Sequence, residues 1–142
     1  MKNYSWSLFS LVWAGLIVYL SFIQPVSVGG VPWFKNQDKL GHFVFYAILG
    51  LTLIKASSQE IIIQNPLTGG ALVALVFGVL IELCQHFFTY NRDGNFLDAL
   101  ANGFGILLMV VLIKVYPKLF HFKLQANLPG LSKSREQSQN KY

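Results

Sequence analysis

The side chains best suited to chemistry lie in one stretch of the sequence, from position 82 to position 102, between two long apolar runs. An ionisable residue inside a segment apolar enough to cross a membrane is costly, so it is interpreted first as part of a functional site. Side chains of these types can transfer protons, bind a polar head group or hydrogen-bond one another. The polar side chains of the stretch include Glu82, Gln85, His86, Arg92, Asp93, Asn95, Asp98 and Asn102.

A second group of polar side chains opens the second apolar run, and it comprises Asp38, Lys39, His42 and Tyr46. Steps of four residues place Asp38, His42 and Tyr46 on one face of a helix, because a helix has about 3.6 residues per turn. A carboxylate at the start of such a helix also suits the positive end of the helix dipole.

Proton transfer is the enzymatic chemistry that these residues allow, with Glu82 and His42 as candidate acid and base. The sequence has no nucleophilic serine motif and no phosphate-binding glycine loop, so no substrate is defined. The spacing of the metal-ligating residues resembles no dedicated zinc pattern, and we expect no metal and no other cofactor. The residues considered for a metal are His42, Glu82, His86 and Asp98.

Each candidate also has a structural interpretation. Glu82 can belong to a hydrogen-bond network inside a bundle, His42 can be a packing residue, and Asp98 can cap its helix. His86 lies beside the membrane boundary and can face lipid headgroups, and Arg92 can form an ordinary solvated pair in a loop. For Glu82 the functional interpretation is favoured, because of its place in an apolar run.

The composition indicates a membrane protein. Hydrophobic residues make up 54% of the 142-residue chain and charged residues 12%, whereas soluble domains carry about 25% charged residues. The net charge is +5, and six of the eleven Lys and Arg residues follow position 113. Basic residues beside the last apolar run are typical of a cytoplasmic flank facing anionic lipid, which argues against nucleic acid as a partner.

Four apolar runs are long enough to cross a bilayer, which takes about 20 residues in a helix. A cleaved signal peptide is the alternative for the first run, but its length and the lack of an Ala-x-Ala site favour a retained helix. We predict an all-α polytopic membrane protein, a four-transmembrane-helix bundle in residues 1–120 with a flexible polar cytoplasmic tail in 121–142. The predicted spans are residues 5–23, 38–54, 67–88 and 97–116.

Small residues recur at four-residue spacing in two of these spans. Gly70, Ala74 and Gly78 share one helix face, and Ala101 and Gly105 share another. Small residues on one face let neighbouring helices approach closely. We expect these positions to be packing surfaces rather than ligand cradles.

Alternating spans place both termini on one side of the membrane. That side holds eight Lys and Arg residues and the other side three, which predicts cytoplasmic termini. His42, Glu82 and Asp98 then all fall at the outer end, with Glu82 about 9 Å from the end of its span. We expect these side chains to converge in the outer-leaflet half of the bundle.

Two blocks of the sequence resemble the VanZ-like family. The first is Asp38-Lys39-Leu40-Gly41-His42-Phe43, followed by Tyr46, Leu49 and Gly50. The second is similar to the family's E-x-x-Q…R…D-x-x-x-N-x-x-G pattern, with Asn95 where many members have an acidic residue and Met109 where a glycine is common. The matching residues are Glu82, Gln85, Arg92, Asp98, Asn102 and Gly105.

The resemblance implies a small integral protein of the bacterial cytoplasmic membrane with an outward-facing polar site. The family's namesake is associated with low-level resistance to teicoplanin, a lipidated glycopeptide. The leading hypothesis is binding of a polar-headed amphiphile, such as a lipid-linked envelope precursor or a lipoglycopeptide. The alternatives are an enzyme acting on such a lipid and a structural or interaction protein. The expected binding residues are Asp38, Lys39, His42, Tyr46, Glu82, Gln85, Arg92, Asp98 and Asn102.

Overall fold

The structure is a computed structural model that describes residues 4–22, 36–59, 65–88 and 96–121. Apart from a few residues at the helix ends, the described residues form helices and include no β-strand, so the all-α prediction is confirmed. The observed helices begin and end within three residues of the predicted spans. They are α1 (Ser5–Phe22), α2 (Gln37–Ser57), α3 (Pro66–Phe88) and α4 (Phe96–Val115).

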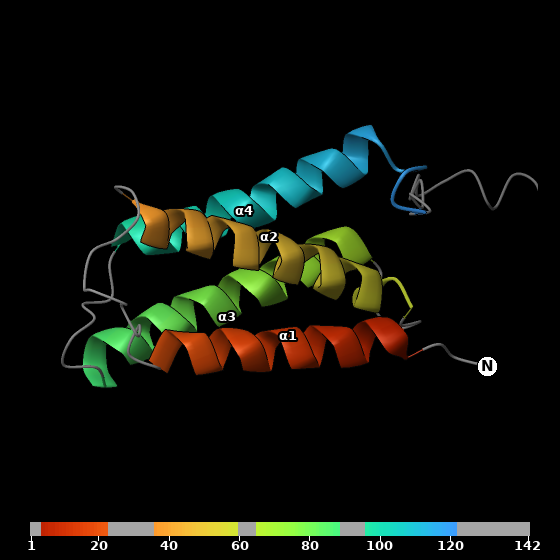
Figure 1. The fold of residues 1–142 in the computed structure, drawn as a ribbon. Coiled ribbons are helices and arrows are strands. Elements are labelled where there is room, and N and C mark those ends of the chain that lie inside the picture. Colours follow the sequence, from red (N-terminus) through yellow and green to blue (C-terminus); the bar gives the residue numbers. More distant parts are fainter. Residues whose placement is uncertain (1–3, 23–35, 60–64, 89–95, 122–142) are drawn as a thin grey trace, which may run out of the picture.

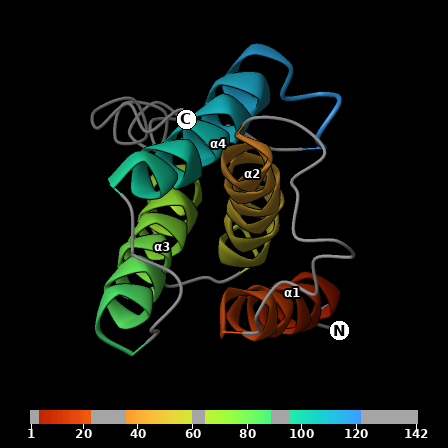
Figure 2. The same ribbon diagram turned by 60° about the vertical axis from the view of Figure 1, so that its left-hand side comes forward.

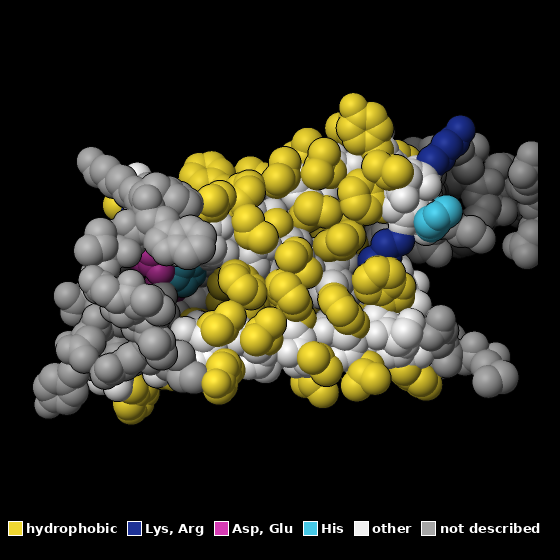
Figure 3. Space-filling model, viewed as in Figure 1, with side chains coloured by type: hydrophobic (Ala, Val, Ile, Leu, Met, Phe, Trp, Pro, Cys, Tyr) yellow, Lys and Arg dark blue, Asp and Glu magenta, His cyan; other side chains and the backbone are white. Residues whose placement is uncertain are grey.

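All four helices are long and apolar enough to cross a membrane. They contain between 18 and 23 residues, which corresponds to about 27 to 35 Å at 1.5 Å per residue and matches a hydrocarbon core of about 30 Å. Hydrophobic side chains cover the middle of the bundle in Figure 3, while acidic side chains show at one end, Lys or Arg at the other, and a histidine at each end. The chain thus has the helix lengths and surface of a multi-pass membrane protein.

Helix α2 occupies the centre of the bundle and contacts α1, α3 and α4 (Figures 1 and 2). Helix α1 packs on α2 and α3, and Figure 2 shows it on the opposite side of α2 from α4. The chain direction alternates, so that α2 begins, α3 ends and α4 begins at the same end of the bundle, the left end in Figure 1. The start of α1 and the end of α4 lie at the opposite end.

Two hydrophobic clusters form the core along α2. The larger cluster has members from all four helices and lies toward the end of the bundle where α2 and α4 begin. The smaller cluster lies toward the opposite end, where α2 ends. Trp13 of α1 also donates a hydrogen bond from its indole Nε1 to the carbonyl oxygen of Phe45, at 3.0 Å. The buried members of the clusters are Ile17, Tyr46, Leu49, Ala74 and Ile106 in the first and Ile54, Leu67 and Ile113 in the second.

The glycines of the predicted small-residue faces lie at close contacts between helices. A Cβ added at Gly70 would lie 2.5 Å from the Cα of Ile54, and one at Gly78 would lie 2.8 Å from the ring of Tyr46. At Gly105 an added Cβ would overlap the carbonyl oxygen of Phe43. All three glycines therefore let α3 or α4 approach α2, as expected for packing residues.

Helix α2 continues to Ser57, three residues beyond the predicted end at 54. The predicted boundary was wrong because Lys55, the first charged residue after the apolar run, ends the run but not the helix. A basic residue in the last turn of a helix is instead favourable beside the negative end of the helix dipole. The start of α3 follows the expected turn chemistry, since Pro66 is its first residue and the Asn65 Oδ1 accepts from the Thr68 N–H at 3.4 Å.

Replacing Gly105 with alanine should destabilise the bundle by about 1–3 kcal/mol, because the new methyl group meets the α2 backbone rather than a mobile side chain. Thermal unfolding in detergent measures the effect. Gly103→Ala is the matched control, since its Cβ would meet only the Leu75 Cδ1 at 4.0 Å. Equal unfolding temperatures for the two variants would contradict the close approach of α4 and α2.

Candidate functional site

A cluster of polar side chains lies inside the end of the bundle where α2 and α4 begin and α3 ends. Helix α2 supplies three of its members, α3 one and α4 two. The members from α3 and α4 are buried, although they stand in helices with apolar outer faces. This polar cluster consists of Asp38, Lys39, His42, Glu82, Asp98 and Asn102.

Asn102 joins three helices at the centre of the polar cluster and is 1% exposed. Its amide Nδ2 donates to the Glu82 Oε1 at 3.2 Å, and its Oδ1 lies 3.1 Å from the His42 Nδ1. The His42 Nδ1 also lies 3.4 Å from the Glu82 Oε1. Since both neighbours of Nδ1 are oxygen acceptors, this nitrogen is the one that carries a proton.

Two ion pairs lie at the outer edge of the polar cluster. The Lys39 Nζ is 3.2 Å from the Asp98 Oδ1. The His42 Nε2 is 3.8 Å from the Asp38 Oδ1, which is an ion pair when the imidazole is protonated. The side chains of Lys39 and Asp38 are 30% and 48% exposed, whereas that of Asp98 is 9% exposed. The cluster is thus buried at Asn102 and accessible at Asp38 and Lys39.

Tyr46 follows His42 by one turn of α2, and the two rings are stacked with centroids 6.5 Å apart. The residue is 1% exposed, and its hydroxyl has no hydrogen-bond partner among the described residues. The ring is held against Gly78, one turn before Glu82. An unsatisfied buried hydroxyl costs about 1–3 kcal/mol, so this position calls for a polar partner.

Gln85 is buried, but its described hydrogen bond joins two helices and does not connect it to the polar cluster. Its Nε2 donates to the carbonyl oxygen of Ser21 at 2.9 Å, which fastens the end of α1 to α3. The sequence gives no signal for this pair, because an acceptor carbonyl carries no residue preference. Gln85 was expected to offer its amide to a ligand, and that role stays a prediction.

Other predicted residues fall outside the polar cluster. His86 is exposed and its ring contacts that of Phe87 edge-on, at 5.2 Å between centroids. Arg92, together with Asp93 and Asn95, lies outside the described residues, so its expected role is untested.

Asp98 is the third residue of α4 rather than the residue that precedes it. Its carboxylate reaches across to Lys39 of α2. A residue that only caps its own helix would not make this contact with another helix. The expected convergence of His42, Glu82 and Asp98 at one end of the bundle is confirmed, and Asn102 joins them. The side of the membrane that this end faces and the function of these residues stay predictions.

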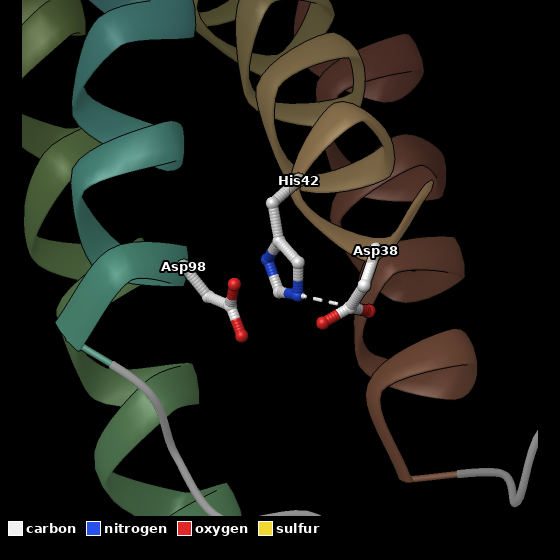
Figure 4. Close-up of side chains that lie close together, drawn as sticks. All are labelled: Asp38, His42 and Asp98. Carbon is white, nitrogen blue, oxygen red and sulfur yellow. Dashed lines mark ion pairs between the residues drawn. The ribbon is translucent and has the colours of Figure 1, made fainter. Parts of the chain in front are cut away.

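The contacts also group three metal-ligating residues that the sequence did not group. Asp38, His42 and Asp98 each offer a ligand atom, and these atoms lie within 4.8 Å of one another. Figure 4 shows the two carboxyl groups pointing toward the imidazole of His42 from opposite sides. The set considered from the sequence contained Glu82 and His86 and left out Asp38. The sequence analysis placed Asp38 and His42 on one helix face but did not place Asp98 beside that face.

Comparison with protein-family models, with curated proteins and with solved structures finds no match to this chain. The function is therefore argued from the geometry of the polar cluster. That geometry offers carboxylate acceptors, an ammonium donor, an imidazole and an amide at one end of an apolar bundle.

Asn102→Ala should destabilise the protein by about 1–3 kcal/mol, because it leaves a buried carboxylate and a ring nitrogen without their shared amide. The unfolding midpoint in detergent gives the change, with His86→Ala as an exposed control at the same end of the bundle. An Asn102→Ala midpoint as high as that of the control would show that the network contributes nothing to stability.

Proposed function

We propose that the chain is a VanZ-like integral membrane protein of the bacterial cytoplasmic membrane whose polar cluster binds the head group of an amphiphile at the outer leaflet. The observation that carries the proposal is the contact of His42, Glu82 and Asn102, each from a different helix, inside an apolar bundle. Buried ionisable groups in membrane helices are expensive and usually serve ligands, ions or protons.

The accessible edge of the polar cluster supports binding over a purely internal network. Lys39 and Asp38 are partly exposed and lead inward to Asp98 and His42. An amphiphile would keep its chains against the hydrophobic helix faces while its head group exchanged hydrogen bonds with this edge. Lys39 suits an anionic group, and the carboxylates suit hydroxyl or amide donors. A lipid-linked envelope precursor or a lipoglycopeptide combines these features.

The distribution of basic residues supports cytoplasmic termini. Lys55 and Lys114 stand in the last turns of α2 and α4, at the end of the bundle opposite the polar cluster. Basic residues favour the cytoplasmic side of membrane helices. This orientation places the polar cluster in the outer leaflet, which agrees with the location implied by the resemblance to the VanZ-like family.

The test is the lipid that the purified full-length protein retains, identified by mass spectrometry. We expect a specific polar-headed lipid in excess over bulk phospholipid, and an at least tenfold loss of it in Glu82→Gln and His42→Ala. Glu82→Gln keeps the shape of the side chain and removes its charge. His86→Ala is the control, because this exposed histidine lies outside the polar cluster.

A structural role alone predicts a different result. Both variants would then unfold at lower temperature but retain the same lipids as the wild type. Equal lipid retention by the wild type and by correctly folded variants would contradict the binding proposal.

An enzyme acting on a lipid-linked substrate is the second candidate, favoured by the position of His42 between two carboxylates. Its Nε2 faces Asp38 and its Nδ1 faces Glu82, an arrangement in which an imidazole can pass a proton between donor and acceptor. Incubation with a polyprenyl-diphosphate-linked saccharide, followed by mass spectrometry of the lipid, separates turnover from binding. A product formed by the wild type but not by Glu82→Gln would establish the enzyme, and unchanged substrate would exclude turnover of this lipid.

A further inference from the structure

The outer edge of the polar cluster has the donor set of a metal site. Asp38 and His42 stand four residues apart on one face of α2, and Asp98 faces them from α4 (Figure 4). Their ligand atoms lie within 4.8 Å of one another, whereas the ligands of one zinc ion lie about 3–3.5 Å apart for bonds of about 2.0–2.2 Å. The exposed side chain of Asp38 can close this difference by rotation about its own bonds.

The proton on His42 leaves one ring nitrogen available for a cation. Its Nδ1 faces the oxygens of Asn102 and Glu82 and therefore carries the proton. In the neutral ring the Nε2 then presents a lone pair toward the Asp38 carboxylate, 3.8 Å away. A lone pair facing a carboxylate is unfavourable unless a proton or a metal ion lies between them.

Asp98 contributes a buried oxygen that is not hydrogen-bonded. Its Oδ1 is inaccessible to solvent and has no hydrogen-bond partner among the described residues. The Lys39 Nζ lies 3.2 Å from this oxygen as an ion-pair partner, without hydrogen-bond geometry. Because a carboxylate oxygen has two lone pairs, this buried oxygen can accept a metal ion beside the Lys39 ammonium.

The charges of the polar cluster match a divalent cation. Its six residues hold the carboxylates of Asp38, Glu82 and Asp98 and the ammonium of Lys39, which gives a net charge of −2 when His42 is neutral. A surplus of negative charge at the end of an apolar bundle is costly, and buried charges are paired or coordinate metals. One divalent ion brings the sum to zero.

We propose that Asp38, His42 and Asp98 bind a divalent transition-metal ion, with Zn²⁺ as the preferred ion. An imidazole among the ligands favours zinc over magnesium, which prefers oxygen ligands and retained water. Glu82 and Asn102 hold the other ring nitrogen of His42, the support that metal-binding histidines ordinarily have. This inference replaces the sequence-based expectation of no metal and does not depend on the amphiphile proposed above, because the ion binds without it.

Titration of Zn²⁺ into chelator-stripped full-length protein in detergent, purified through a tag without histidine, tests the inference. Isothermal titration calorimetry should give one ion per chain, and the same protein should bind Mg²⁺ at least tenfold more weakly. Asp98→Asn and His42→Gln should lose zinc binding, while Asp38→Asn and Glu82→Gln should weaken it by about 10–100-fold.

Two controls make the test decisive. Replacing both His86 and His121 with alanine leaves His42 as the single histidine of a chain that has three, and this double variant should bind zinc as the wild type does. Asp38→Asn alters an exposed side chain, so a loss of binding there cannot come from misfolding of the core. Absence of stoichiometric binding by the wild type, unchanged binding by Asp38→Asn, or its loss in the double variant would each overturn the site.

Discussion

The need to compensate charge inside an apolar bundle governs the polar end of this structure. Glu82 and Asp98 are removed from water by helices whose outer faces suit lipid, so each carboxylate needs partners from another helix. Asn102 meets this need for Glu82 with a hydrogen bond, whereas Lys39 forms an ion pair with Asp98 whose buried oxygen has no hydrogen bond among the described residues. Because these contacts join α2, α3 and α4, the same interactions that compensate the charges also determine how the three helices meet.

Close helix packing makes those contacts reachable. Gly78 lies one turn before Glu82, and Gly105 follows Asn102 by three residues; both allow α2 to come close beside the polar cluster. A larger residue at either position would hold the helices apart, and a hydrogen bond stretched beyond about 3.5 Å loses most of its value. Helix α1 takes no part in the cluster contacts described here and is fastened separately, through Trp13 and Gln85.

The polar cluster has a buried part and an accessible edge, and the functional proposals depend on both. Asn102 is almost completely buried, whereas Lys39 and Asp38 are accessible at the end of the bundle. The accessible edge is where a head group or an ion would arrive, and the buried part keeps the imidazole of His42 in one orientation. With its net negative charge, the cluster favours hydroxyl and amide donors, and a bound cation would extend that preference to phosphate groups.

The sequence by itself determined the four helices, their limits within three residues, the small-residue packing faces and the shared depth of the polar side chains. These features are local or periodic: apolar runs of bilayer length, four-residue spacing, and proline or glycine between the runs. Which partners meet was decided only by the tertiary structure, because helix rotation depends on packing across the whole bundle. The bond from Gln85 to Ser21, the bridging position of Asn102 and the grouping of Asp38 with Asp98 all arise in this way.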